Sequence, residues 1–99
     1  DNVNLSNRSL ENFNPLVFEI FPNPSSGIFN LYFEDFSIEN FDLSIVDISG
    51  KLILDKGYSF SKGGPRAVSL NLTNLSQGVY LLKVKANDKS IVKRLVINE

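Results

Sequence analysis

The chain has 99 residues, which suits one domain, and 42% of them are hydrophobic, including eight phenylalanines. It contains no cysteine and no histidine, which excludes disulfides, Ser-His-Asp and Cys-His catalysis and the common zinc sites. The net charge is −1: residues 1–50 carry one basic and eight acidic residues, whereas residues 51–99 carry nine basic and three acidic ones.

Residues 1–14 are polar and rich in Asn and Ser, which is typical of a flexible linker. From Pro15 onward, short apolar runs of strand length alternate with turn residues, and none has a helical period. We therefore predict a linker over residues 1–14 and one β domain over residues 15–99.

The first predicted strand is residues 16–21, closed by Pro22, Asn23 and Pro24. Proline lacks an N–H group, and the residue before a proline prefers an extended backbone. We expect this segment to stop strand pairing while the chain stays extended, and residues 25–27 to form a turn. The second predicted strand is residues 28–33, with Phe29, Leu31 and Phe33 on one face.

The third predicted strand, residues 41–48, alternates apolar and polar residues, as a strand with one buried face does. Asp47 can accept hydrogen bonds within the turn that follows, and Gly50 can take a positive φ, so residues 47–51 predict a tight hairpin. The fourth strand is predicted over residues 51–54. Residues 55–66 contain three glycines and a proline, which predicts a long irregular crossing segment.

Residues 67–72 and 79–86 are the fifth and sixth predicted strands, joined by a turn over residues 73–78. A turn at residues 87–89 leads into the seventh strand, residues 90–97, and completes a C-terminal hairpin. Tyr80 follows a glycine turn, which resembles a tyrosine corner whose phenol caps a neighbouring main-chain group. Seven short strands at this spacing predict an all-β, seven-stranded immunoglobulin-like antiparallel sandwich with Greek-key connections.

The uneven charge has two interpretations. Early and late strands that lie side by side would compensate each other, since opposite charges on paired strands stabilise a sheet. Alternatively, the last two strands form a basic face that is available to an anionic partner. The acidic residues Glu34, Asp35, Glu39 and Asp42 lack the spacing of a calcium-binding loop. A domain this small also has little room for a substrate cleft, so we expect no catalytic site, no metal and no cofactor.

Four segments, taken in order, resemble one family: FPNPSSG at residues 21–27, VDISGK at 46–51, LSQGVYLL at 75–82 and KRLVI at 93–97. They are similar to the type A C-terminal sorting domain of the type IX secretion system of Bacteroidota, over about residues 16–97. Besides the residues of the last segment, the resemblance marks eleven residues with mainly structural roles: Pro22, Asn23, Pro24, Gly27, Asp47, Gly50, Lys51, Leu75, Gly78, Val79 and Tyr80.

The resemblance implies that the domain directs an upstream cargo through the outer-membrane translocon, after an export signal further upstream has brought it to the periplasm. The implied partners are the translocon and its shuttle proteins, and a sortase-like cysteine protease that cuts the linker. The implied location is the periplasm in transit, and then the outer membrane and cell surface or the medium. Neither an enzymatic activity nor a nucleic-acid partner is expected.

The segment expected to be recognised consists of Lys93, Arg94, Leu95, Val96 and Ile97. A terminal strand can offer main-chain hydrogen bonds at its edge and side chains at alternate positions, which is recognition by strand addition. The alternative is an ordinary last strand with Lys93 and Arg94 in solvent. An exposed edge could also pair with a second copy to give a homodimer.

The other functions considered are an accessory immunoglobulin-like surface module that binds carbohydrate or protein, and a structural spacer. The absence of Trp, and the core-facing positions of most Phe residues, argue against carbohydrate binding.

Overall fold

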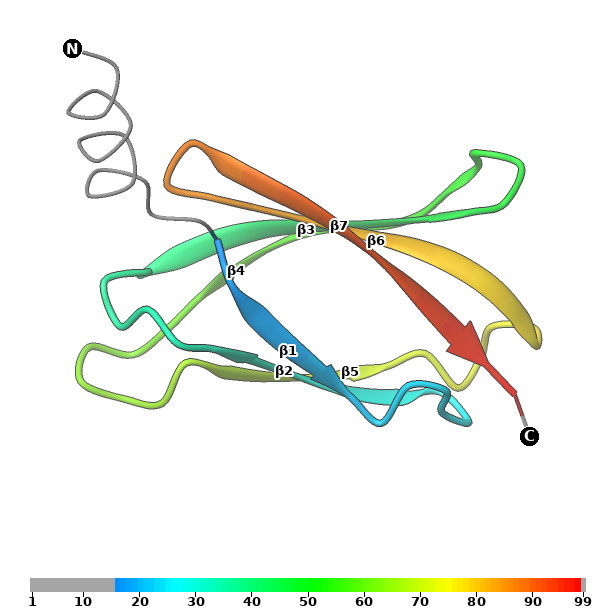
Figure 1. Ribbon diagram of the computed structural model, residues 1–99, viewed down its shortest axis with the longest axis horizontal. Helices are drawn as coiled ribbons and strands as arrows, with labels where there is room; N and C mark the ends of the chain where they lie inside the picture. The colour runs from blue at the N-terminus through cyan, green and yellow to red at the C-terminus, as the bar shows by residue number, and fades with distance from the viewer. Residues whose placement is uncertain (1–15, 99) are drawn as a thin grey trace, which may run out of the picture.

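The computed structural model describes residues 16–98, and the regular structure in that part of the chain is entirely β-strand (Figure 1). No helix in these residues is long and apolar enough to cross a bilayer. Seven strands follow one another: β1 (Phe18–Phe21), β2 (Ile28–Phe33), β3 (Asn40–Asp47), β4 (Leu52–Ser59), β5 (Ala67–Asn71), β6 (Gly78–Ala86) and β7 (Lys89–Ile97). The prediction of seven strands in an all-β domain is confirmed. The predicted linker, residues 1–14, lies outside the described residues.

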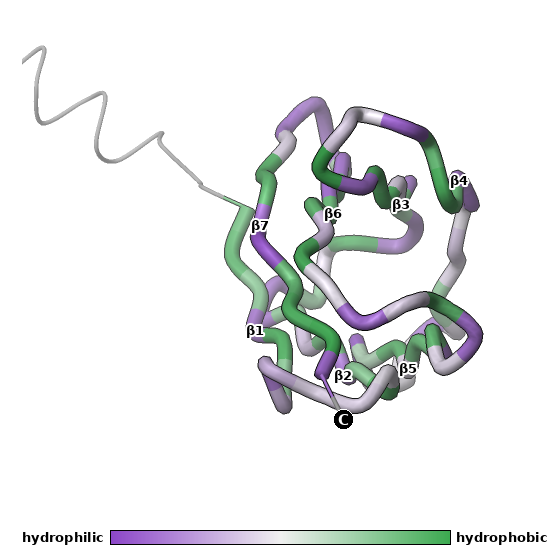
Figure 2. Tube along the Cα trace, turned by 90° about the vertical axis from the view of Figure 1, so that its right-hand side faces the viewer, coloured by the Kyte–Doolittle hydropathy of each residue, from purple (hydrophilic) through white to green (hydrophobic). Residues whose placement is uncertain are grey.

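The strands form two sheets that lie over one another as layers (Figures 1 and 2). The three-stranded sheet has the order β1-β2-β5, and the four-stranded sheet has the order β4-β3-β6-β7. All pairings within the sheets are antiparallel. β7 is therefore an edge strand of the larger sheet.

Side chains that alternate along the strands fill the space between the sheets. The predicted inward faces of three strands are confirmed by their burial: Phe29, Leu31 and Phe33 on β2, Phe41, Leu43 and Ile45 on β3, and Tyr80, Leu82 and Val84 on β6. The ring of Phe33 lies 5.2 Å from that of Phe18 and 4.8 Å from that of Phe41, centroid to centroid. Both distances are ones that aromatic pairs prefer, and the contact between Phe33 and Phe41 joins the two sheets.

The fourth strand is longer than predicted. It runs from Leu52 to Ser59, so residues 55–59 belong to the sheet and not to an irregular crossing. Gly57 falls in the predicted irregular crossing, but it pairs with Asp42 of β3, and a Cβ there would lie 3.3 Å from Asp42 Oδ1. The next residue, Tyr58, stacks on Phe41 with ring centroids 5.1 Å apart. Pairing with β3 and this packing outweigh the low strand preference of glycine.

Residues 60–66 form the shorter irregular crossing, which is organised by Arg66. This buried side chain donates from Nη1 to the main-chain oxygens of Ser61 and Gly64, at 3.1 and 2.9 Å, and from Nη2 to Phe36 O at 2.9 Å. Its guanidinium also lies 5.3 Å from the ring centroid of Phe60. One cation thus ties the crossing to the loop between β2 and β3.

Candidate functional site

The segment predicted to be recognised, residues 93–97, is the second half of β7 and is divided between two environments. Leu95 and Ile97 point toward the other sheet and are fully buried. Arg94 is exposed and Val96 is half-buried on the opposite side of the strand. Leu95 and Ile97 therefore belong to the core, and Arg94 and Val96 are the members of the segment that a partner can reach from outside.

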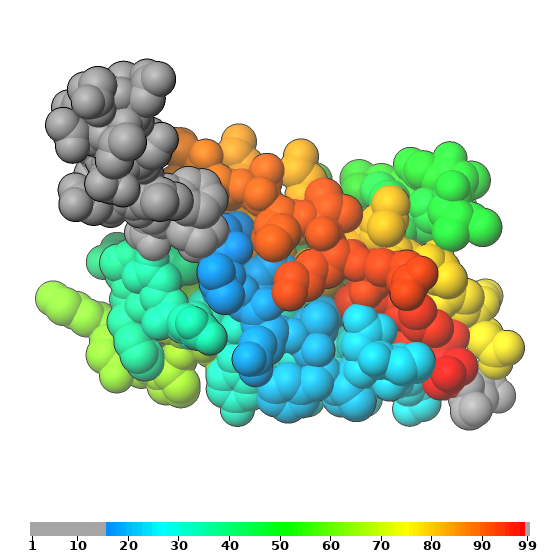
Figure 3. Space-filling view, in the orientation of Figure 1, coloured from blue at the N-terminus to red at the C-terminus, as the bar shows by residue number. Residues whose placement is uncertain are grey.

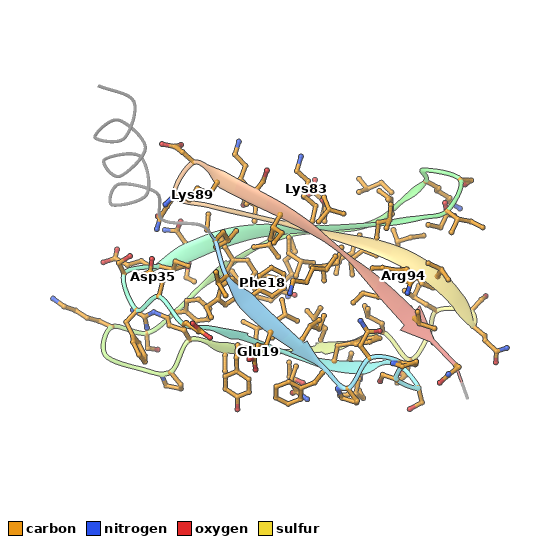
Figure 4. The ribbon with its side chains drawn as sticks, in the orientation of Figure 1. Phe18, Glu19, Asp35, Lys83, Lys89 and Arg94 are labelled. Atoms are coloured by element: carbon orange, nitrogen blue, oxygen red, sulfur yellow. The ribbon has the colours of Figure 1, made fainter. Side chains whose placement is uncertain are left out.

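Lys93 joins the two sheets. Its Nζ donates a hydrogen bond to the main-chain oxygen of Phe18, at 2.9 Å, and lies 4.9 Å from the centroid of the Phe18 ring. Phe18 lies between the sheets on β1, in the three-stranded sheet (Figure 4). Lys93 is thus partly buried and hydrogen-bonded, whereas Arg94 beside it is exposed. The alternative interpretation, in which both side chains lie in solvent, describes Arg94 but not Lys93.

The outer edge of β7 is covered by the segment that follows β1. The side chain of Asn23 donates from Nδ2 to Arg94 O at 2.8 Å, and its Oδ1 accepts from Val96 N at 3.0 Å. A side-chain amide has one oxygen acceptor and N–H donors, so it replaces the missing neighbour strand at this point. The sequence analysis missed this role, because the bonds join residues more than 70 positions apart.

Ser25 continues the cover toward the end of β7. Its N–H donates to Val96 O at 3.0 Å, and its carbonyl accepts from Asn98 N at 2.8 Å, which makes a short parallel bridge opposite Ile97. Figure 3 shows the red end of β7 against the light blue segment after β1. We call Asn23 and Ser25 with their four bonds to β7 the edge cap.

The prediction that β1 ends before Pro22 is confirmed, but the expectation of an extended backbone is wrong. Residues 22–24 bend, and the peptide bonds Phe21–Pro22 and Asn23–Pro24 are both cis. Asn23 within this bend and Ser25 just after it both bond to β7. The order of residue types indicates a strand end, but it does not indicate where the chain goes next.

The turn at residues 25–27 is fixed by a close approach to the chain between β5 and β6. Gly27 O accepts from Leu72 N at 2.7 Å, and Gly27 has a φ of 135°. A Cβ at this position would lie 2.7 Å from the Cα of Thr73. Ser25 Oγ accepts from Gly27 N at 3.1 Å and so holds the turn from the other side. Glycine is required here by both conformation and space.

The predicted hairpin at residues 47–51 is confirmed. Asp47 Oδ1 accepts from the N–H groups of Ser49 and Lys51, both at 2.9 Å, and from Ser49 Oγ at 2.7 Å. Gly50 takes a φ of 89°. The hydrogen bond from the Ser49 hydroxyl, followed by that from the Lys51 main chain, lowers the pKa of Asp47 below its ordinary value of 3.8. The carboxylate therefore stabilises the turn in its charged form.

The predicted tyrosine corner is also present. Tyr80 Oη donates to the main-chain oxygen of Ser76 at 2.7 Å, while its ring is buried in the core. Leu75 packs against the same core, and its N–H donates to Leu72 O at 3.0 Å. The segment from Leu75 to Tyr80 thus anchors the start of β6, the strand on which β7 pairs. Gly78 and Val79, the first two residues of β6, face Ile97 and Val96.

The two oppositely charged halves of the chain meet where β3 pairs with β6. Asp42 stands opposite Lys85 in the register, which supports the interpretation that the halves compensate each other. A surface hollow of about 150 Å³ lies here, lined by Asp42, Leu43, Ser44, Asp55, Lys83 and Lys85. Within residues 16–98, no group of three or more Asp and Glu side chains could hold a metal ion.

The sequence of this chain matches the profile of a known protein family. The profile of the family described as "Secretion system C-terminal sorting domain" matches residues 19–98, which include the edge cap, the tyrosine corner and β7. The chain belongs to this family. No curated protein matches it.

A C-terminal sorting domain of this family is a signal for type IX secretion, so sorting is the function of this chain. The family is not an enzyme family. Membership implies that the domain acts in cis on a cargo and interacts with the type IX machinery, which exports cargo to the outer membrane and cell surface or beyond. The residues marked by the resemblance divide in the structure into turns, the edge cap, the tyrosine corner and β7. The family name alone does not say which of these the machinery contacts.

Proposed function

We propose that β7 is the element by which the type IX machinery recognises this domain, with residues 93–97 at its centre. The observation that supports this is a set of hydrogen bonds that hold β7 in place. The edge cap, the Lys93 bond and the tyrosine corner beneath β6 all fix the position of this one edge strand. They hold Arg94 and Val96 in a defined place on the surface.

The proposed sorting cycle begins in the periplasm. The upstream cargo passes with the domain from the periplasm through the translocon, delivered by shuttle proteins. A sortase-like cysteine protease then cuts within residues 1–14, and the cargo is anchored at the surface or released. The domain has no catalytic part in these steps and is a substrate of the protease. A polar segment ahead of the folded domain is where proteases find accessible backbone.

We further propose that the sandwich is immunoglobulin-like with Greek-key connections. The sheet orders β1-β2-β5 and β4-β3-β6-β7 support this, because consecutive strands cross between the sheets three times. A homodimer through an edge strand would use an edge other than the second half of β7, because the edge cap occupies that part.

The proposal is tested by export of a reporter. A periplasmic reporter is fused ahead of residues 1–99 and expressed in a host with the type IX system and in a translocon mutant. We expect display that depends on the translocon and is lost when residues 93–99 are deleted. Display that survives this deletion would contradict the role of β7.

Deleting these residues also removes Leu95 and Ile97 from the core, so a folding control is needed. Leu70→Ala on β5 removes a buried side chain from the smaller sheet and costs about 2–4 kcal/mol. Circular dichroism compares its unfolding with that of the deletion variant. If Leu70→Ala is exported and the deletion is not, the loss is specific to β7. If both lose export together, stability and not β7 carries the effect.

A further inference from the structure

The main-chain edge of residues 94–98 is not available to a partner strand. Arg94 O, Val96 N, Val96 O and Asn98 N all bond to the edge cap. Recognition of this half of β7 by strand addition would first have to break four hydrogen bonds. The side chains that β7 and its neighbour β6 turn outward can be reached without such a change.

The outward residues of β6 and β7 form one continuous face. The register pairs them as Val79 with Val96, Leu81 with Arg94, Lys83 with Val92 and Lys85 with Ser90. Four of the eight are aliphatic; Leu81 is 41% exposed and Val92 is 55% exposed. We call these eight residues the β6–β7 outer face. In Figure 4, Lys83 on this face points away from the three-stranded sheet.

This face has a net positive charge. It holds Lys83, Lys85 and Arg94 and no carboxylate. On the adjacent strand β3, Asp42 stands opposite Lys85, but Lys83 faces Ser44. Arg94 pairs with the aliphatic Leu81. Arg94 thus lies beside aliphatic side chains with no acidic residue opposite it in the sheet, whereas Lys83 borders the hollow that Asp42 and Asp55 also line.

We propose that the β6–β7 outer face is the docking surface of this domain, and that its occupant is a protein surface of aliphatic side chains with carboxylates placed to meet Lys83 and Arg94. The inference deepens the proposed role of β7. Charge complementarity selects the partner, because the face carries three cations and no carboxylate of its own, and its Arg94 has no acidic residue opposite it in the sheet. A lipid surface fits less well, since the face has no aromatic side chain to insert among acyl chains.

The test uses the reporter fusion with the full chain. The double variant Lys83→Glu/Arg94→Glu reverses the charge of the face, and Lys56→Glu/Lys62→Glu makes the same change in charge at exposed residues on β4 and in the crossing after it. We expect the first to lower the exported fraction about tenfold or more, and the second to leave it within about twofold of wild type. Both purified chains should keep the wild-type circular dichroism spectrum and melting temperature.

Equal export of the two double variants would overturn the docking surface, while the deletion of residues 93–99 separately tests the role of β7. Export that rises above wild type in Asn23→Ala, which uncovers the edge, would also overturn it in favour of strand addition. Co-sedimentation with phosphatidylglycerol vesicles tests the occupant. We expect none, and co-sedimentation that is lost in Lys83→Glu/Arg94→Glu would replace the protein partner with a membrane.

Discussion

The Nζ of Lys93 on β7 lies 2.9 Å from the main-chain oxygen of Phe18 on β1 and connects the open sides of the two sheets. Replacing this lysine with methionine keeps most of its aliphatic length but removes the charged donor and the contact with the Phe18 ring. We expect Lys93→Met to lower the free energy of unfolding by about 1–2 kcal/mol. Urea denaturation measures it.

Lys62→Met is the matched control, because Lys62 is exposed and lies in the crossing between β4 and β5. It should change the free energy of unfolding by less than about 0.5 kcal/mol. Equal losses in the two variants would contradict a specific bond between the sheets.

The two hydrogen bonds that Asn23 makes in the edge cap can be separated by mutation. Asn23→Ala removes both, and we expect a loss of about 1–2 kcal/mol and faster hydrogen exchange at the Val96 amide. Asn23→Asp keeps an oxygen acceptor for Val96 N but loses the donor to Arg94 O. It should therefore protect the Val96 amide while still destabilising the domain. Unchanged Val96 exchange in Asn23→Ala, measured by NMR, would argue against the cap.

Two glycines with positive φ should respond differently to alanine. At Gly27 the new Cβ would lie 2.7 Å from the Cα of Thr73, whereas at Gly50 nothing lies within 4 Å. We expect Gly50→Ala to cost about 1–2 kcal/mol, from backbone strain alone. Gly27→Ala adds a steric clash with main chain and should cost at least about 1 kcal/mol more. Thermal unfolding of both variants checks the order, and an equal or larger loss at Gly50 would contradict the close approach.

The lowered pKa of Asp47 predicts an acid dependence of stability. A carboxyl group whose pKa is lower in the folded than in the unfolded chain adds stability above its unfolded pKa and loses it as the pH falls through the folded pKa. With an ordinary value of 3.8, this contribution is complete near neutral pH and declines below about pH 4. The difference in unfolding free energy between wild type and Asp47→Asn should shrink over that range. A difference that is constant from pH 7 to about pH 2.5 would contradict the charged turn.

The sequence by itself determined most of the strands and several turns, because these depend on neighbouring residues. Alternation placed the buried faces of β2, β3 and β6 correctly. Asp47 and Gly50 predicted the hairpin that contains them. Asp47 bonds to residues within four positions, and Gly50 contributes only its own positive φ. For the same reason Tyr80 predicted a hydrogen bond from its phenol to a neighbouring main-chain group, which in the structure is Ser76 O. Four local segments in the right order were also sufficient to indicate the family.

Only the tertiary structure decided which surfaces of β7 remain free. The bond of Lys93 to Phe18 spans 75 positions, and the Asn23 bonds to Arg94 and Val96 span 71 and 73. The prediction of an irregular crossing at Gly57 is wrong, because the place of Gly57 in β4 depends on pairing with Asp42 in another strand. Contacts of this kind have no period in the sequence. They exist because two layers fold onto each other, and this packing decides that the edge of β7 is closed and its outer face is open.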